Sequence, residues 1–228
     1  EIRLSLVGSE MCIRDSTKSM SRTAEAMAKD IDISLKNLRT DYIDLYQIHN
    51  APPADVEKVC SPGGALEALT AAKKAGKIGH IGITAHSLET FRMALELPWV
   101  ETIMFPYNIV EDQAKELIHV CAEKNIGFIA MKPLAGGAIE DAVTALRYVC
   151  ADPDVTVVIP GMADIAELNQ NLAAVNDSSP LSVEEEAKMR AIRDALGTQF
   201  CRRCNYCQPC SAGISISSVF LFEGYLSR

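Results

Sequence analysis

Residues 42–49 read YIDLYQIH, a short apolar run of β-branched and aromatic side chains that ends in a histidine. This length and composition predict a buried strand rather than a helix. Before the run, Met27, Ile31, Leu35 and Leu38 recur at helical spacing. That spacing predicts a helix directly before the strand.

The alternation of helix and strand continues along the chain. Strands are expected at residues 42–49, 80–84, 102–107, 127–131 and 155–159, and helices at 88–97, 112–124, 139–150 and 165–175. A further helix is marked by Leu66, Leu69 and Ala72, with Gly76 as its stop. Strands joined by helices pair in parallel, and parallel sheets bury both faces, so we expect all five strands to be buried.

Two α/β architectures fit five such strands, a (β/α)8 TIM barrel and an open doubly wound sheet. No G-x-G-x-x-G motif follows a first strand, which weakens the dinucleotide-binding open sheet. Polar or functional-looking residues recur at the strand ends, where a barrel carries its chemistry. These residues are His49, Thr84, His86, Tyr107, Asn108, Lys132, Pro160 and Gly161.

The composition limits the class of protein. The 228 residues carry a net charge of −8, which argues against a nucleic-acid surface. No apolar run is long enough to span a bilayer, so no membrane association is expected. Four of the eight cysteines crowd into ten residues, and no convincing signal peptide is present. We therefore expect a cytoplasmic protein that binds metal in a reducing compartment.

The first sixteen residues, EIRLSLVGSEMCIRDS, have neither strand alternation nor helical period. Residues 7–16 look like the translation of a sequencing-library adapter. Our hypothesis is that residues 1–16 are an artefact that replaced the true upstream sequence, and that native sequence begins near Thr17. A signal peptide is the alternative, but Glu10, Arg14 and Asp15 interrupt any apolar core.

The C-terminal part changes character after residue 175. Ser182 and Glu185 form a capping-box pattern that predicts a helix to about Leu196, with Gly197 as its stop. Four cysteines at three-residue spacing then form the candidate metal ligands: Cys201, Cys204, Cys207 and Cys210. The spacing favours an iron–sulfur cluster, because zinc sites normally separate two C-x2-C pairs by a longer stretch. Zinc stays the alternative.

Several motifs together resemble the aldo/keto reductases, in the branch with a C-terminal ferredoxin-like segment. They are TKS at 17–19, SLKNLRTDYIDLYQIHN at 34–50, GKIGHIGITAHS at 76–87, FPYN at 105–108, MKPLAGG at 131–137, VIPGM at 158–162, LNQNL at 168–172 and the cysteine run. The resemblance implies an incomplete (β/α)8 barrel over residues 17–197 that holds strands 4 to 8. It also implies a 4Fe-4S tail over residues 198–228, itself truncated.

The resemblance further implies an oxidoreductase that reduces a small-molecule carbonyl, an aldehyde or ketone, with NADP or NAD as cofactor. Lys18 matches the family lysine that makes a catalytic Tyr more acidic, and His49 matches the histidine that orients the substrate oxygen. The family's Tyr and Asp lie upstream of this chain, and Tyr42 and Tyr46 are not expected to replace them. This polypeptide alone should therefore not reduce carbonyls efficiently.

Residues that match the family's cofactor contacts follow the later strands: Thr84, Met104, Met131, Gly136, Gly137, Pro160, Gly161, Met162, Gln170 and Asn171. Thr84 would reach the nicotinamide amide, whereas Met104 and Met131 fit barrel core equally well. The glycines allow close approach to a pyrophosphate, and the helix after residue 162 would offer free N–H groups to phosphate. Glu167 would repel a 2′-phosphate, which leaves NAD and NADP both open.

Two functions are compatible with the sequence, and a non-functional fragment is the third alternative. The first is the carbonyl reductase with a cluster tail and a redox partner protein. The second is an electron-transfer or binding protein that uses the barrel as a scaffold. Because a barrel removes strand edges by closing, we also expect exposed edges on strands 4 and 8 and self-association of the isolated chain.

Overall fold

The computed structural model describes residues 16–197, 209–216 and 218–220. The chain divides into two compact units. The first unit comprises Glu1–Ala85 and Leu97–Thr102, and the second comprises His86–Glu96 and Ile103–Arg228.

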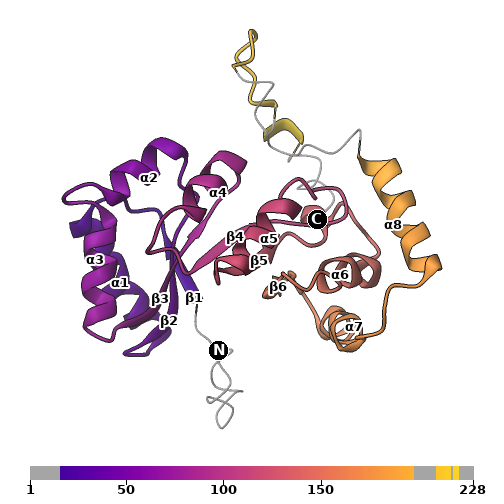
Figure 1. Ribbon diagram of the computed structural model, residues 1–228, viewed down its shortest axis with the longest axis horizontal. Helices are drawn as coiled ribbons and strands as arrows, with labels where there is room; N and C mark the ends of the chain where they lie inside the picture. The colour runs from indigo at the N-terminus through magenta and orange to yellow at the C-terminus, as the bar shows by residue number, and fades with distance from the viewer. Residues whose placement is uncertain (1–15, 198–208, 217, 221–228) are drawn as a thin grey trace. The chain divides into compact units, whose positions relative to one another are not determined.

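Three parallel strands form the sheet of the first unit, in the order β1 (Ser16–Ser19), β2 (Ile43–Ile48) and β3 (Ile78–Thr84). The register pairs Lys18 with Gln47 and Ile48 with Ile83. Its helices are α1 (Ala24–Leu38), α2 (Pro53–Cys60) and α3 (Ala65–Lys74). Helices α1 and α3 pack side by side on one face of the strands (Figure 1).

Helix α1 follows directly from its sequence. The Thr23 hydroxyl accepts a hydrogen bond from the Ala26 N–H and so caps the first turn. Met27 and Ile31 are fully buried, as their spacing predicts. The helix ends at Arg39, which takes a left-handed conformation with φ of 55°. Capping and one apolar stripe therefore set the bounds and the buried face of this helix.

The second unit holds three neighbouring strands, β4 (Thr102–Pro106), β5 (Gly127–Met131) and β6 (Val157–Ile159), although the first residue of β4 lies in the first unit. Strands β5 and β6 pair in parallel. The helices are α4 (Leu88–Leu95), α5 (Lys115–Glu123), α6 (Ala142–Cys150), α7 (Ile165–Asn176) and α8 (Val183–Leu196), with a short 3-10 turn at Ala135–Gly137.

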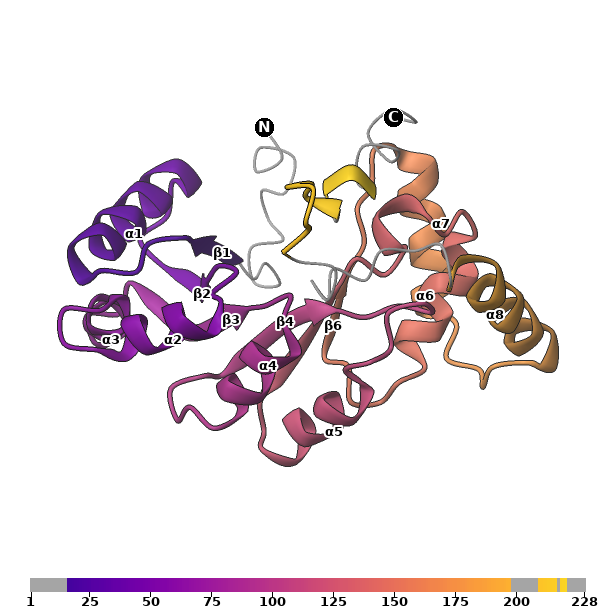
Figure 2. The same ribbon diagram turned by 90° about the horizontal axis from the view of Figure 1, so that it is seen from above.

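Aromatic packing forms part of the core of the second unit. The Phe91 ring stacks on Phe128 with 5.9 Å between centroids, and Tyr107 meets Phe128 edge to face at 6.2 Å. Helix α6 packs against both α7 and α8, as Figure 2 shows. The capping box predicted for α8 is confirmed, since the Ser182 and Glu185 side chains each accept the other's backbone N–H.

The predicted count of five strands is wrong for the described residues, which hold six. Strand β1 was not expected, because its sequence STKS is short and polar and carries no β-former pattern. It becomes a strand by pairing with β2. The edge of β2, expected to be exposed, is therefore covered by β1. Helix α2 was also not expected; it begins with Pro53, a residue suited to a first helical turn.

The expected burial of every strand is wrong for β6. Val157 and Ile159 are 45% and 41% exposed, whereas Ile83 in β3 is 1% exposed. In the strand order β6 stands at the end, so its apolar side chains lack a second neighbour in the sheet. In the part of the chain that the structure describes, no helix is long and apolar enough to cross a membrane.

Candidate active site

Lys18 and His49 lie at the same edge of the first unit. Lys18 is the third of the four residues of β1. His49 directly follows β2, and its N–H donates to the Ser19 carbonyl at 2.8 Å. Because the strands run in parallel, their carboxyl ends meet at one edge. Burial, together with the positive charges of Lys18 and Arg22, lowers the pKa of His49. These effects favour the neutral imidazole.

The third strand brings Thr84 to the same edge. The Thr84 hydroxyl lies 3.2 Å from Nδ1 of His49 and accepts the Asn50 N–H at 2.8 Å. Thr84 itself is 1% exposed. Asn50 has a φ of 47°, a left-handed conformation that asparagine adopts more readily than most non-glycine residues. The ends of β1, β2 and β3 thus converge on His49.

Arg22 is a buried cation that sequence reasoning missed. Its Nε donates to the Asp55 carboxylate at 2.9 Å, and its Nη2 donates to the carbonyl oxygens of His49 and Asn50 at 2.8 and 3.3 Å. The residue is 9% exposed. These bonds tie the segment after β1 to the loop after β2. Within the sequence, an arginine between a strand and a helix gives no pattern that separates this role from a surface charge.

A second polar cluster fixes the chain between Lys18 and α1. The Ser19 and Ser21 hydroxyls both donate to the Asp30 carboxylate, the latter at 2.7 Å. Hydrogen bonds from Ser19 and then Ser21 lower the pKa of Asp30. Tyr46 does not belong to this cluster. It is fully buried, and its hydroxyl lies 3.1 Å from the hydroxyl of Ser34 in α1. It is held under the helix and does not line the edge with Lys18.

In the second unit, the residues that match the family's nicotinamide and pyrophosphate contacts differ in their exposure to solvent. Met104 is buried in β4, as a core residue would be, whereas Met131 at the end of β5 is half-buried. Gly136 and Gly137 are exposed and have φ values of 73° and 99°. A Cβ at Gly136 would meet nothing within 4 Å, but its positive φ favours glycine. The loop after β5 therefore fits a close approach of ligand to backbone.

The start of α7 differs from the expectation. The Ala163 N–H donates to the Glu167 carboxylate at 2.6 Å, and the Glu167 N–H donates to the Asp164 carboxylate at 2.8 Å. These two N–H groups are thus already satisfied by anionic side chains, which oppose a phosphate there. Pro160 is half-buried, and Gly161 and Met162 are exposed beside this helix start. Gln170 is exposed and Asn171 is buried.

Comparison with known proteins decides the family. The model of the aldo/keto reductase family matches residues 3–144. The chain belongs to the aldo/keto reductase family. Its curated relatives include L-galactose dehydrogenase of Arabidopsis thaliana, 25% identical over 72% of this chain and 62% of the relative. The uncharacterized oxidoreductase YcsN of Bacillus subtilis is 36% identical over 48% of this chain and 36% of the relative.

Solved aldo/keto reductases share the fold. The holo form of aldo-keto reductase AKR11C1 from Bacillus halodurans superposes with a TM-score of 0.68 at 23% identity, covering 83% of this chain and 75% of that one. A thermostable aldo-keto reductase, Tm1743, in complex with epalrestat, gives a TM-score of 0.59 at 22% identity, covering 78% and 69%. This aldo/keto reductase chain spans about three fifths or less of the length of its first curated relatives.

Three of the four predicted cluster ligands, Cys201, Cys204 and Cys207, lie outside the described residues. Cys210 is described and half-buried. Hydrogen bonds from backbone N–H groups, that of Ile214 first, lower the pKa of its thiol, which favours the thiolate that a metal binds. Among the residues with a described position, no group of three His, Cys, Asp or Glu could hold a metal. The cysteine run therefore stays a prediction.

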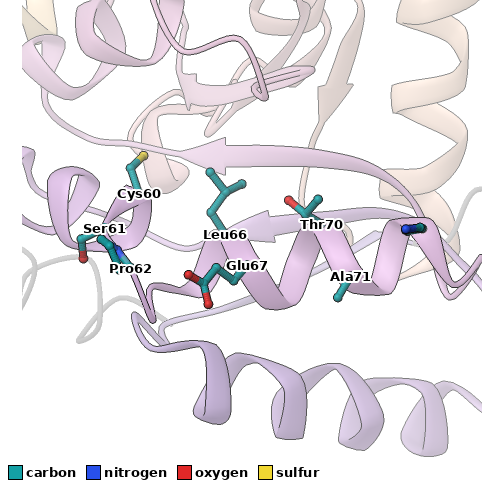
Figure 3. A pocket seen from close by; sticks show the side chains of 8 residues that line it. Cys60, Ser61, Pro62, Leu66, Glu67, Thr70 and Ala71 are labelled. Atoms are coloured by element: carbon teal, nitrogen blue, oxygen red, sulfur yellow. The ribbon is translucent and has the colours of Figure 1, made fainter.

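Two pockets of this aldo/keto reductase include neither Lys18 nor His49 among their lining residues. One, of about 560 Å³, opens beside α2 and α3 and is lined by Cys60, Leu66, Glu67 and Thr70 (Figure 3). The other, of about 410 Å³, lies in the second unit and includes Tyr107 and Asp152.

Tyr107 donates to the Asp152 carboxylate at 2.9 Å, and burial raises its pKa far above its usual range. The Tyr107 hydroxyl proton is thus engaged by the Asp152 carboxylate.

Proposed function

We propose that the chain is part of a nicotinamide-dependent oxidoreductase that reduces an aldehyde or ketone to an alcohol. Lys18 and His49 are proposed as catalytic residues, and the residues matched in the second unit as cofactor contacts. The proposed setting is cytoplasmic, and the proposed cofactor is NADP or NAD.

One observation supports this proposal above the others. Lys18 and His49 are 31 residues apart in sequence, yet they lie at the ends of adjacent parallel strands, near enough for the lysine charge to lower the pKa of the imidazole. In an α/β barrel, reacting groups gather at this edge. A neutral imidazole beside a cation can hydrogen-bond a carbonyl oxygen, and the cation can stabilise negative charge that develops on it.

The reaction balances with few groups. A bound nicotinamide would supply the hydride to the carbonyl carbon. The carbonyl oxygen receives a proton from a general acid, and the products are an alcohol and the oxidised nicotinamide. We propose that the acid is a tyrosine hydroxyl, as the family resemblance implies, and that the Lys18 charge makes it more acidic.

The residues that would hold the cofactor fit it in part. The open, positive-φ loop at Gly136 and Gly137 suits a pyrophosphate. The carboxylates of Asp164 and Glu167 at the start of α7 do not suit a phosphate at that helix. This second observation favours NAD over NADP, because the 2′-phosphate adds negative charge.

The test of the reductase uses the gene completed from its source DNA and purified protein. We expect oxidation of NADH or NADPH that depends on an added aldehyde or ketone. Lys18→Met and His49→Ala should each lower kcat/KM by about 100-fold. The matched variants Lys36→Met and His80→Ala should leave kcat/KM unchanged. Wild-type rates in both Lys18→Met and His49→Ala would overturn the proposal.

We further propose that the cysteine run binds a 4Fe-4S cluster. The chain purified without oxygen should contain iron and acid-labile sulfide in equal amounts, with the broad visible absorbance of such a cluster. Cys201→Ser and Cys204→Ser should lose both, whereas Cys150→Ser, a cysteine outside the run, should keep them. Stoichiometric zinc without sulfide would contradict the proposal and favour the structural zinc site.

A further inference from the structure

Thr84 matches a cofactor contact of the family, and in the structure its hydroxyl contacts His49. The hydroxyl lies 3.2 Å from His49 Nδ1, and its oxygen already accepts the Asn50 N–H at 2.8 Å. Thr84 is the last residue of β3 and is 1% exposed. A buried hydroxyl has one proton, and leaving that proton without an acceptor is costly.

Only one arrangement satisfies every polar group in this contact. If His49 donated from Nδ1, the Thr84 oxygen would accept two hydrogen bonds and its own proton would lack an acceptor among its contacts in the described part of the chain. If Thr84 donates to Nδ1, the Thr84 proton, the Thr84 oxygen and the imidazole Nδ1 are all satisfied. Donation to Nδ1 requires that the proton of the neutral imidazole sit on Nε2.

The backbone that carries the imidazole is held from two further sides. The Arg22 guanidinium donates to the carbonyl oxygens of His49 and Asn50, and the His49 N–H donates to the Ser19 carbonyl. The Asn50 N–H donates to the Thr84 hydroxyl. The backbone N–H and C=O groups of both His49 and Asn50 are therefore all hydrogen-bonded. The backbone from which the imidazole extends towards the Thr84 hydroxyl is therefore held in place.

We propose that Thr84 is a positioning residue that donates its hydroxyl proton to His49 Nδ1 and so keeps the imidazole in the Nε2–H form. In that form His49 offers an N–H donor to a carbonyl oxygen. The hydroxyl proton of Thr84 is then not available to the nicotinamide amide. The catalytic meaning of this tautomer rests on the proposed reductase function, whereas the tautomer itself is a property of the chain as it stands.

The first test observes the tautomer directly. The chain has four histidines, so imidazole 15N labelling gives four ring systems, and that of His49 is identified by its loss in His49→Gln. At pH 8 we expect His49 to show a protonated Nε2 and an unprotonated Nδ1. Thr84→Ser keeps a hydroxyl and should keep this pattern. Thr84→Val keeps the shape without the hydroxyl and should give a mixture of tautomers or the Nδ1–H form.

A protonated Nδ1 in the wild-type chain would overturn the inference, with no variant needed. An unchanged Nε2–H pattern in Thr84→Val would also overturn it. These readouts require no activity, so they separate this inference from the reductase proposal.

In the completed enzyme, Thr84→Val should lower kcat about tenfold, the rate equivalent of roughly one net hydrogen bond, and leave KM for the nicotinamide cofactor unchanged. Thr84→Ser should restore kcat. A raised cofactor KM with unchanged kcat would instead make Thr84 a cofactor contact and contradict the inference.

Discussion

Two regions of the molecule have similar strand and helix patterns in sequence but are stabilised differently. One is the sheet formed by β1, β2 and β3, and the other runs from β6 to α8. In the first, Ile48 and Ile83 are almost fully buried. In the second, the apolar side chains of β6 and of α7 are largely exposed, including Ile159 at 41% and Ile165 at 74%. Apolar composition alone therefore does not decide burial, because burial needs a neighbouring element on each face.

Polar contacts hold the second region where apolar packing does not. Arg147 of α6 has a side chain that is 4% exposed and donates to the Glu185 carboxylate at 2.9 Å. It also donates to the carbonyl oxygens of Asp177 and Ser179, which precede α8. One buried cation thus connects α6 to the segment that leads into α8. The comparison predicts that stability in the two regions responds to different substitutions.

The largest expected effect is on the free energy of unfolding after truncation of a strand side chain. Ile83→Ala should cost about 2–5 kcal/mol, because it opens a cavity in packed surroundings. The matched variant Ile159→Ala should cost less than about 1 kcal/mol, because the side chain is already exposed to water. Urea denaturation of both variants measures the difference. Equal losses would mean that β6 is as well covered as β3.

The next effect concerns the buried cation. Arg147→Met should destabilise the chain by about 3 kcal/mol, since the Glu185 carboxylate and several carbonyl oxygens lose their donor. Arg147→Lys should recover only part of this, because an ammonium group cannot reproduce the planar fork of donors. In hydrogen-exchange measurements on Arg147→Met, the amides of α8 should lose protection first. A loss spread evenly over β1–β3 would contradict the assignment of Arg147 to the second region.

A smaller effect is expected at the start of α8. Ser182→Ala removes the acceptor of the Glu185 N–H at 3.1 Å and should cost about 1 kcal/mol. Ser182→Asp, which keeps an acceptor at the cap, should be close to wild type. Denaturation followed by circular dichroism measures both. An unchanged free energy of unfolding in Ser182→Ala would show that the stability of α8 depends on Arg147 rather than on its N-terminal cap.

The contact between Arg147 and Glu185 should also make the stability of the chain depend on pH. Hydrogen bonding to Arg147, then to the Ser182 backbone, lowers the pKa of Glu185 from 4.5 to about 2. A depressed folded pKa gives a stabilisation that is present above pH 4.5 and is lost as the pH falls towards 2. Glu185→Gln should remove this part of the acid dependence while it keeps a capping acceptor. Denaturation curves at pH 7, 4 and 3 compare the two proteins, and parallel pH profiles would contradict the prediction.

The sequence by itself determined the order and approximate bounds of most elements. The apolar runs at β2, β3, β4 and β5 and the helical period in α1 arise from local preferences that neighbours do not reverse. The capping box of Ser182 and Glu185 was readable because both partners lie within one turn. The expectation that Lys18 and His49 share one edge came from the family resemblance and the parallel strand pattern.

Tertiary structure alone decided what depends on partners far away in sequence. The polar segment Ser16–Ser19 is a strand only because β2 offers it a hydrogen-bonding edge, and β6 is exposed because no further strand follows it in the described order. Arg22 and Thr84 act on His49 from 27 and 35 residues away, through contacts that no local pattern encodes. Local conformational preferences can be predicted from neighbouring residues in the sequence. The hydrogen-bond partners and the burial of a residue depend on segments that are distant in the sequence, so only the tertiary structure determines them.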